Sequence, residues 1–408
     1  MARREKAKDS ETAAAGGGRR QRKVYTRAIE AVRKKIPLKP RGMPARLPGP
    51  WGVKTVPVAV AGIGGAVPAR RVTTRELIDT YKLETTEDWV HEKLGIDERR
   101  YASPDVQTSD LAAAAALKAI EMAGIDPLDI GGISVMLGYG DVRAPATACY
   151  VQRKIGAWNA FAVDVDCACS GFIIGCEMGR RFVQDGSMKA FLAIGADVGS
   201  RTKVDPHDRT LGMIFGDAAA AAVLTRCDEG EGILSGYIRS DGRAAEIIGV
   251  KAGGSVMPIS HEAVKEGHHL IKMDGPGVWN MATRGMPEAI REACGRLGIK
   301  PQHLDFLVTH QANLRLIEAV MKLFDLPMGL THTTVQKFGN TSAASVGVTL
   351  ADAFFEGKVK KGDLVCLAGV GAGFTWAADV IRWSISAEKR SLAMVEVPAG
   401  GAIPSRQS

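Results

Sequence analysis

Short, continuously apolar runs separated by amphipathic segments make up most of the chain from about Pro57 onward. Continuous apolar runs are typical of strands that are covered on both faces of a sheet. Because these runs alternate with helical patterns, the sequence predicts an α/β fold. The predicted strands are GISVML (132–137), FAVDV (161–165), AFLAIGA (190–196), AAAAAVL (218–224), LDFLVT (304–309) and DLVCLAGV (363–370).

Two segments of the chain share one order of elements, CSGFIIGCEMGRRFVQDGSMKAFLAIG and NTSAASVGVTLADAFFEGKVKKGDLVCLAG. Each runs from a small-residue turn through a helix and a glycine turn to an apolar strand. The first begins at Cys169 and reaches Gly186 after 17 positions, and the second begins at Asn340 and reaches Gly357 after 17. The shared order and spacing predict a duplicated α/β unit, which would bring Cys169 and Asn340 to related places near one cleft.

The charge divides the chain into a basic arm and a nearly neutral body. Residues 1–50 hold 15 Lys and Arg against 4 Asp and Glu, a net charge of +11, whereas the remainder holds 38 basic and 41 acidic residues, a net charge of −3. We therefore expect four parts. These are a basic, largely disordered N-terminal arm (1–55), an N-terminal half (56–226), a C-terminal half (227–384) and a C-terminal tail (385–408).

Part of the arm has helical spacing, with Tyr25, Ile29, Val32 and Ile36 on one face before prolines end the pattern. We favour a solvated, partly helical arm. A second interpretation is an arm that contacts an acidic partner or an anionic membrane surface. The body has no interleaved basic and aromatic pattern, so we expect no nucleic-acid binding.

The composition is that of a globular protein, with 46% hydrophobic residues and enough length for a large core. The seven cysteines are scattered and form no CxxC pair, which argues against both a disulfide framework and a zinc site. We expect a reducing, cytoplasmic location. No apolar run approaches the length of a membrane span, and the N-terminus has no apolar signal segment.

Cys169 is the candidate nucleophile. It follows a predicted strand, and SGF after it opens a predicted helix. A thiol at a helix start lies near unsatisfied N–H groups and the positive end of the helix dipole, both of which favour the thiolate. The alternative is a small, buried cysteine with a packing role. Cys167, two residues earlier, is expected to pack beside it.

Two further residues stand at similar junctions. His310 ends an apolar strand and opens the polar turn THQANLR, and Asn340 lies in the small-residue turn KFGNTSAAS before a helix. Ligands of open α/β sheets bind at the carboxyl ends of strands. Acyl transfer by a cysteine requires groups that stabilise developing negative charge, so the three residues together predict such a site. Each alone is equally compatible with an ordinary loop residue.

Six motifs in order make the chain resemble the β-ketoacyl-[acyl-carrier-protein] synthase III family of thiolase-superfamily condensing enzymes. They are TTEDWVHEKLGIDERR (85–100), DCACSGF (166–172), DPHDRTLGMIFGDAAAAAVL (205–224), HQANLR (310–315), GNTSAAS (339–345) and GVGAGFTW (369–376). The resemblance covers residues 57–384 approximately. It implies a thiolase-like fold, in which duplicated α/β halves form a five-layer α-β-α-β-α sandwich, and a homodimer.

The resemblance also implies a reaction without a cofactor or metal. Cys169 takes the acyl group of an acyl-CoA primer, and His310 and Asn340 stabilise the enolate formed when malonyl-[acyl-carrier protein] loses carbon dioxide. The carbanion attacks the acyl-Cys169 thioester to give 3-oxoacyl-[acyl-carrier protein], which initiates fatty-acid or related chain synthesis. Backbone N–H groups of Cys169 and Ala372 would hold the tetrahedral oxyanion.

Other positions match the family's binding residues. Trp89, Lys93 and Arg209 would contact CoA, with Lys93 in place of a frequent arginine. Arg315 and Lys322, seven apart on one helix face, would dock the acidic carrier protein, although a solvated face is a strong alternative for Lys322. Three positions depart from the family pattern: Pro276 and Asn280 replace common polar and basic residues, and Ala372 interrupts a glycine triplet. The resemblance implies that Ala144 and Val370 line the acyl pocket, with Ala144 in the place of a phenylalanine that caps the pocket across the dimer in some members.

The small side chain of Ala144 predicts acyl primers longer than acetyl. Two alternatives to fatty-acid initiation remain at this stage. One is a thiolase-fold condensing enzyme or acyltransferase of polyketide or other secondary metabolism. The other is a non-catalytic partner subunit, against which the intact Cys169, His310 and Asn340 argue.

Overall fold

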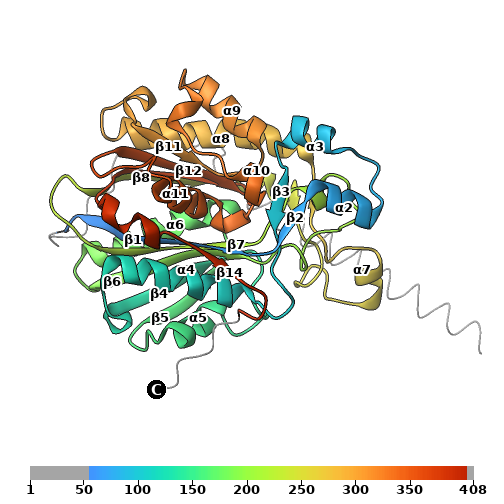
Figure 1. Ribbon diagram of the computed structural model, residues 1–408, viewed down its shortest axis with the longest axis horizontal. Coiled ribbons are helices and arrows are strands. Elements are labelled where there is room, and N and C mark those ends of the chain that lie inside the picture. Colours follow the sequence, from blue (N-terminus) through green and yellow to red (C-terminus); the bar gives the residue numbers. More distant parts are fainter. Residues whose placement is uncertain (1–54, 402–408) are drawn as a thin grey trace, which may run out of the picture. The chain divides into compact units, whose positions relative to one another are not determined.

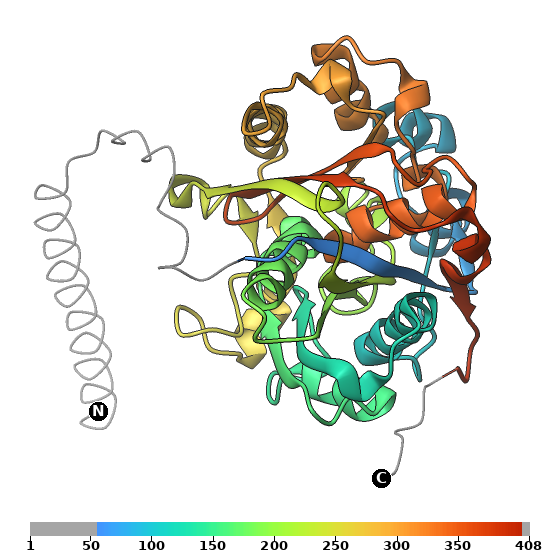
Figure 2. The same cartoon turned by 90° about the vertical axis from the view of Figure 1, so that its left-hand side faces the viewer.

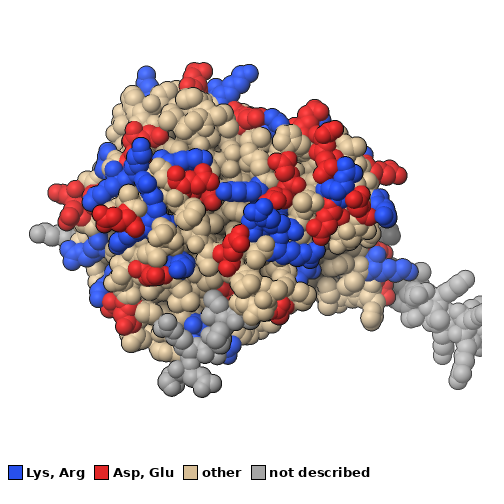
Figure 3. Space-filling view, in the orientation of Figure 1, with Lys and Arg blue, Asp and Glu red and all other residues tan. Residues whose placement is uncertain are grey.

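The computed structural model describes residues 55–401. The predicted N-terminal arm, including the helical pattern over 25–36, therefore lies outside the described residues. Residues from Thr55 onward belong to one compact unit. Within the described range, no helix is long and apolar enough to cross a membrane. Acidic and basic side chains are interspersed on the face shown in Figure 3, as expected for a body with little net charge.

Two sheets form the centre of the molecule (Figure 1). The first has the strand order β14-β1-β7-β6-β4-β5, and the second has the order β11-β12-β13-β8. The first comprises β1 (Val58–Pro68), β4 (Ile130–Met136), β5 (Phe161–Val165), β6 (Ala190–Asp197), β7 (Ala218–Arg226) and β14 (Met394–Val397); the second comprises β8 (Gly232–Ser240), β11 (Phe306–Thr309), β12 (Leu364–Gly371) and β13 (Thr375–Arg382).

The pairing of strands is the same in the two sheets. In the first, β4 pairs with β6 in parallel, and the antiparallel pairs β6–β7 and β7–β1 follow. In the second, β11 pairs with β12 in parallel, and the antiparallel pairs β12–β13 and β13–β8 follow. Four strands of each sheet are therefore equivalent, which is the arrangement that a duplicated α/β unit produces. The first sheet adds β5 and β14 at its two edges.

Helices cover both sheets and also separate them, which gives the α-β-α-β-α layering. Helices α6 (Gly171–Gln184) and α11 (Ser345–Phe355) lie between the sheets, as Figures 1 and 2 show. Helix α4 (Thr108–Ala123) packs on the outer face of the first sheet, and α8 (Gly275–Gly295) packs on the outer face of the second. The remaining helices are α2 (Thr74–Tyr81), α3 (Glu87–Leu94), α5 (Thr147–Ile155), α7 (His261–Lys265), α9 (Leu314–Leu323) and α10 (Val335–Phe338).

The central helices are apolar nearly all round because both of their faces are covered. Ten consecutive residues of α11, Ser345 to Phe354, are buried. Glycine allows close approach here: a Cβ at Gly347 would lie 2.5 Å from the side chain of Ala220 on β7. Two short ribbons complete the described strands, β2 (Arg71–Thr73) with β3 (Glu98–Arg100) and β9 (Ile248–Gly249) with β10 (Lys272–Met273).

The predicted strands are all present, but the two edge strands of the first sheet, β5 and β14, differ from expectation. FAVDV forms β5, yet it lies at the edge of the first sheet, and Phe161 and Val163 are 38% and 37% exposed. It is therefore not a strand covered on both faces. The predicted C-terminal tail contains β14, whose residues pair in parallel with β1 from Gly65 to Pro68. Its four residues carry too little periodicity to be recognised from sequence.

Candidate active site

Cys169 lies in a strained turn between β5 and α6. The turn is one 3₁₀ unit, Ala168–Ser170, and Ala168 has φ of 48°, a left-handed conformation that non-glycine residues rarely adopt. The Ser170 hydroxyl donates to the Cys167 carbonyl at 2.9 Å and closes the turn. Such strain persists where the surroundings over-determine the backbone, and here it places the cysteine directly before α6.

A second turn of the same kind begins two residues after Asn340. The 3₁₀ unit Ser342–Ala344 precedes α11, and its first residue, Ser342, has φ of 52°. The two turns are thus equivalent, with Ala168 matching Ser342. The predicted duplication is present in the order of elements, but the predicted match of Cys169 with Asn340 is wrong by three positions, because Cys169 corresponds to Ala343. The equal spacing of 17 arose because α6 has 14 residues and α11 has 11.

Backbone and side-chain hydrogen bonds fix Asn340. Its N–H donates to the carbonyl of Ile214 at 2.8 Å, and its carbonyl accepts from the N–H of Gly216 at 3.1 Å. Its side-chain Oδ1 accepts from the N–H of Ser342 at 2.9 Å, which leaves Nδ2 without a partner among residues 55–401. Since Oδ1 is occupied, the free end of the amide is a hydrogen-bond donor.

The two turns meet at the candidate nucleophile. The Sγ atom of Cys169 lies 3.9 Å from the Oγ atom of Ser342. The end of β12 closes the other side, because a Cβ at Gly371 would lie 2.6 Å from the backbone nitrogen of Cys169. Ala372 follows directly in the connection to β13, so the predicted oxyanion-binding residues belong to adjoining segments.

Burial controls the titration of the thiol. It raises the pKa of Cys169 to about 11, against the opposing effects of the positive charge of Lys203 and the hydrogen bond with Ser342. The expected net stabilisation of the thiolate is therefore wrong for the free protein, because desolvation outweighs the nearby donors. The cysteine is a protonated thiol near neutral pH, and the proton must leave as a substrate is attacked.

His310 follows β11 and is almost fully buried, with 3% exposure. Burial lowers the pKa of His310 to about 3, so the imidazole is neutral at physiological pH. Its Nδ1 lies 2.5 Å from the Oγ of Ser345, and within the described part of the chain that hydroxyl has no other partner. The buried hydroxyl proton is satisfied only if it is donated to Nδ1. The ring proton then resides on Nε2, which makes His310 a donor like Asn340.

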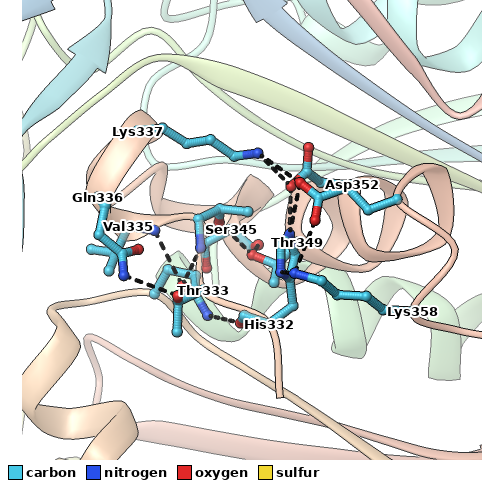
Figure 4. A network of polar contacts seen from close by, with 12 residues as sticks. His332, Thr333, Val335, Gln336, Lys337, Ser345, Thr349, Asp352 and Lys358 are labelled. Atoms are coloured by element: carbon cyan, nitrogen blue, oxygen red, sulfur yellow. Dashed lines mark hydrogen bonds and ion pairs between the residues drawn. The ribbon is translucent and has the colours of Figure 1, made fainter. Parts of the chain in front are cut away.

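The polar contacts behind His310 continue along one side of α11 (Figure 4). The Thr349 hydroxyl donates to the Ser345 carbonyl at 2.7 Å and shares a 2.7 Å contact with the hydroxyl of Thr334. Farther along the helix, Asp352 lies 2.5 Å from Nε2 of His332. Sequence reasoning did not identify Ser345 or this row; the serine is already present in the motif GNTSAAS.

His332, Asp352 and Glu356 could offer three metal ligands, since their ligand atoms lie within 4.8 Å of one another. Lysines already occupy these atoms, however. Lys337 lies 2.8 Å from Asp352, and Lys358 lies 2.8 Å from Nδ1 of His332 and 2.9 Å from Glu356 (Figure 4). The two ammonium groups balance the two carboxylates, so the cluster is satisfied as a salt-bridge network.

The three predicted CoA residues lie around α3. Trp89 and Lys93 belong to that helix, and Arg209, from a distant loop, lies 3.4 Å from the carbonyl of Glu84 just before it. Trp89 is half-buried against the core, Arg209 is exposed, and Lys93 is exposed with its ammonium 2.5 Å from the carboxylate of Glu92.

The two predicted docking residues differ in how free their charges are. Arg315 donates to the carbonyl of Glu92 at 2.8 Å and pairs with Glu318 at 2.6 Å, so it ties α9 to the end of α3. Lys322 is exposed and has no ion pair among the described residues. Of the two residues, Lys322 therefore has the less occupied charge in this structure.

The two predicted pocket residues are in different environments. Val370 is buried in β12 with 4% exposure. Ala144 lies in the exposed loop after β4, in a stretch where Val142 is 48% exposed.

Comparisons with known proteins agree with this geometry. Residues 163–242 match the family profile of 3-oxoacyl-[acyl-carrier-protein] synthase III, and residues 294–383 match the profile of its C-terminal part. The chain is 40% identical over 329 residues to β-ketoacyl-[acyl-carrier-protein] synthase III of Caldanaerobacter subterraneus, covering 81% of this chain and 98% of the relative.

Solved structures are similar as well. A 3-oxoacyl-[acyl-carrier-protein] synthase III from Aquifex aeolicus has a TM-score of 0.73 and 32% identity, covering 80% of this chain and 100% of that chain. The priming β-ketosynthase of the R1128 polyketide pathway has a TM-score of 0.75 and 28% identity, covering 83% and 99%. The chain belongs to the β-ketoacyl-[acyl-carrier-protein] synthase III family, and it is an acyl-transferring condensing enzyme with the thiolase-like α/β fold.

Proposed function

We propose that this enzyme condenses an acyl-CoA primer with malonyl-[acyl-carrier protein] and releases CoA and carbon dioxide, which starts fatty-acid synthesis. One observation supports this most directly. The Cys169 thiol lies at the meeting point of two equivalent turns, and hydrogen bonds to Ser345 and Ser342 fix a buried neutral histidine and a buried amide donor beside the second turn. That combination fits acyl transfer followed by stabilisation of an enolate.

In the first half-reaction, the sulfur of Cys169 attacks the thioester carbonyl of the acyl-CoA. The carbon–sulfur bond to CoA breaks, and CoA leaves with the proton that the thiol gives up. We propose that the N–H groups of Cys169 and Ala372 hold the oxyanion of the tetrahedral intermediate. The close packing of Gly371 on the Cys169 backbone supports this, because it keeps the two segments in register.

In the second half-reaction, Nε2–H of His310 and the Nδ2 group of Asn340 donate to the thioester oxygen of the malonyl group. The bond to carbon dioxide breaks, its electron pair forms the enolate, and the enolate carbon attacks the acyl-Cys169 carbonyl. The thiolate of Cys169 leaves and takes up a proton. Since decarboxylation supplies the carbanion, the reaction needs neither a strong base nor a metal or redox cofactor.

We propose that Trp89, Lys93 and Arg209 bind CoA, with the indole against the adenine and the two cations near phosphates. Their common location around α3 supports this assignment. For carrier-protein docking we propose Lys322 as the contributing charge on α9 and Arg315 as a residue that chiefly holds α9 against α3.

We further propose a homodimer formed through β5. This edge strand leaves its outer backbone groups unpaired and exposes Phe161 and Val163, which is unfavourable for a lone chain. Pairing with a second copy would also place the loop of Ala144 at the partner's acyl pocket, beside residues such as Val370. A sedimentation mass near that of one chain would contradict this proposal.

We propose a cytoplasmic location, since the described cysteines are all free thiols and the proposed chemistry requires one of them reduced. For the N-terminal arm, the net charge of +11 is suitable for contact with an anionic membrane surface. Co-sedimentation with anionic vesicles, compared between the full chain and a chain lacking residues 1–50, tests that contact.

The acylation half-reaction is predicted to accelerate with pH. Since burial raises the pKa of Cys169 to about 11, the thiolate fraction rises about tenfold for each pH unit below that value. We expect CoA release from butyryl-CoA in a single turnover to rise steadily from pH 6 to pH 9, after subtraction of the rate with Cys169→Ala. A plateau that begins below pH 8 would contradict a raised thiol pKa.

Ser345 is predicted to hold His310 in its donating tautomer. Ser345→Ala should reduce the condensation rate about 5-fold, the effect of about 1 kcal/mol from one lost hydrogen bond, while acylation of Cys169 keeps its wild-type rate. Thr349→Val serves as the control, because it removes the next hydroxyl of the same row without touching His310. An equal loss in both variants would show a general effect of the row on stability.

Lys322 is predicted to matter for the carrier protein alone. Lys322→Glu should raise the KM for malonyl-[acyl-carrier protein] about 10-fold and leave the KM for the acyl-CoA primer unchanged, because a reversed charge repels an acidic partner. The matched control is Lys361→Glu, an exposed lysine outside α9. Equal KM values of the two variants for malonyl-[acyl-carrier protein] would show that Lys322 does not contribute to docking.

The proposed function as a whole is tested by product analysis. Purified enzyme, butyryl-CoA and malonyl-[acyl-carrier protein] should give CoA, carbon dioxide and 3-oxohexanoyl-[acyl-carrier protein] in equal amounts. Release of CoA without a 3-oxoacyl product would reduce the activity to acyl transfer. Exclusive use of acetyl-CoA as the primer would refute the prediction from Ala144 that the acyl pocket accepts primers longer than acetyl.

A further inference from the structure

A buried lysine and a buried aspartate lie next to the catalytic region, and the proposed reaction uses neither. The side chain of Lys203 is 5% exposed and that of Asp197 is 1% exposed. Asp197 is the last residue of β6, and Lys203 lies in the long connection to β7. Burial of a charged pair is costly, so its hydrogen bonds would ordinarily be complete.

The hydrogen bonds of this pair are incomplete. Nζ of Lys203 lies 3.7 Å from Oδ2 of Asp197, too far for a hydrogen bond, and it makes none to any residue in the range 55–401. Oδ2 of Asp197 is likewise buried without a partner, although Oδ1 accepts the N–H groups of Gly138 and Tyr139. The Lys203 ammonium group and one Asp197 carboxylate oxygen therefore lack a hydrogen-bond partner among the described residues.

Two aromatic rings lie against the ammonium group, and one of them belongs to the segment that pairs with Asn340. Nζ of Lys203 lies 5.5 Å from the centre of the Tyr139 ring and 4.9 Å from that of the Phe215 ring. Tyr139 begins the loop that leads to Ala144, and Phe215 pairs through its backbone with Asn340. The charge of Lys203 also lowers the pKa of the Cys169 thiol, as expected for a neighbour.

We propose that Lys203 and Asp197 bind a hydroxyl group on the acyl chain carried by Cys169, so that the preferred primers are short hydroxyacyl thioesters. This inference rests on the proposed function. A hydroxyl oxygen can accept from Nζ and donate to Oδ2, and it can reach both because they are 3.7 Å apart. A carboxylate fits less well, because it would add a negative charge beside Asp197.

The pair also explains how such a site would select its primer. A site that hydrogen-bonds a substrate hydroxyl rejects the analogue without it, because the buried polar groups are left unpaired. An alkyl primer would bring methylene groups against the ammonium and the free carboxylate oxygen. A hydroxyacyl primer of the same length pairs both.

The test compares primers of one chain length on the wild-type enzyme. The panel is butyryl-CoA, both enantiomers of 3-hydroxybutyryl-CoA, 4-hydroxybutyryl-CoA and succinyl-CoA, with kcat/KM measured for 3-oxoacyl product. We expect at least one hydroxyacyl primer to exceed butyryl-CoA by about 10-fold or more, the discrimination that a hydrogen bond to a charged group provides. The proposal would be overturned if kcat/KM for butyryl-CoA equals or exceeds that for every hydroxyacyl primer. It would also be overturned if succinyl-CoA has the highest kcat/KM.

A variant then links the preference to the residue. Lys203→Met should bring the ratio of hydroxyacyl to butyryl kcat/KM close to one, while Lys189→Met, an exposed lysine at 68%, keeps the wild-type ratio. An unchanged ratio in Lys203→Met would also overturn the proposal. If Lys203→Met does not fold, Lys203→Gln replaces it. This variant keeps a hydrogen-bond donor but loses the charge, and the ratio of hydroxyacyl to butyryl kcat/KM should again fall below that of the wild type.

Failure of this inference is distinguishable from failure of the proposed function. Butyryl-CoA alone suffices to show an acyl adduct on Cys169 and a 3-oxoacyl product. If those appear without any hydroxyacyl preference, the condensation stands and the role of Lys203 and Asp197 is refuted. If no primer gives a product, the proposed function fails first.

Discussion

Cys169→Ala is expected to abolish the acyl adduct and to lower the condensation rate by at least about 10³-fold, since no other residue supplies the nucleophile. The sulfur is the point at which the two strained turns meet, 3.9 Å from Ser342. Intact-protein mass spectrometry after incubation with butyryl-CoA measures the adduct directly. The wild-type protein should gain one butyryl group, and Cys169→Ala should gain none.

Cys167 provides the matched control for this experiment. Its sulfur contacts Sδ of Met136 at 3.7 Å and the Val165 carbonyl at 3.9 Å, so it packs against β4 and β5. Burial raises its pKa to about 12. Cys167→Ala should therefore retain the adduct, and an adduct that persists in Cys169→Ala and disappears in Cys167→Ala would exchange the roles of the two cysteines.

His310→Ala and Asn340→Ala are expected to separate the two half-reactions. Each removes one donor to the enolate oxygen, and loss of such a donor typically reduces the rate about 10²- to 10³-fold. Acylation of Cys169 should continue, because neither side chain hydrogen-bonds the thiol. Two quantities are measured in the same sample. They are the release of carbon dioxide from malonyl-[acyl-carrier protein] and the mass of the butyryl adduct on Cys169.

Asn340→Asp sharpens this prediction because it keeps the shape of the side chain. Oδ1 can still accept from the N–H of Ser342, but the donor Nδ2 is replaced by an oxygen. Decarboxylation should fall as far as in Asn340→Ala. If Asn340→Asp decarboxylates at the wild-type rate, donation by Asn340 is not part of the mechanism.

The sequence was most informative where local pattern and tertiary environment agree. The buried strands β4, β6, β7, β11 and β12 are largely apolar, so their type and approximate bounds follow from the hydrophobic runs. The two equivalent turns before α6 and α11 were recognisable as small-residue segments, although the sequence matched them three positions out of register. Cys169, His310 and Asn340 were predicted because each lies at the end of a strand or before a helix.

Features that depend on contacts between distant segments were not predictable. The helix start at Cys169 suggested a stabilised thiolate, but burial by the other half of the molecule raises the pKa of the thiol. The contact of Arg315 with the end of α3 joins residues more than 200 positions apart, so no local pattern predicts it. Lys203 and Asp197 gave no local signal, since only the folded chain brings them together.

In the proposed mechanism, one thiol first holds the primer and then delivers it to a decarboxylated malonyl group at the same site. The most direct measurement follows the mass of Cys169 through one turnover: butyryl-CoA is added, excess is removed, and malonyl-[acyl-carrier protein] is supplied. We predict that the butyryl adduct disappears as an equal amount of 3-oxohexanoyl-[acyl-carrier protein] forms. A stable adduct, or its loss as free butyrate without the 3-oxoacyl product, would contradict the mechanism.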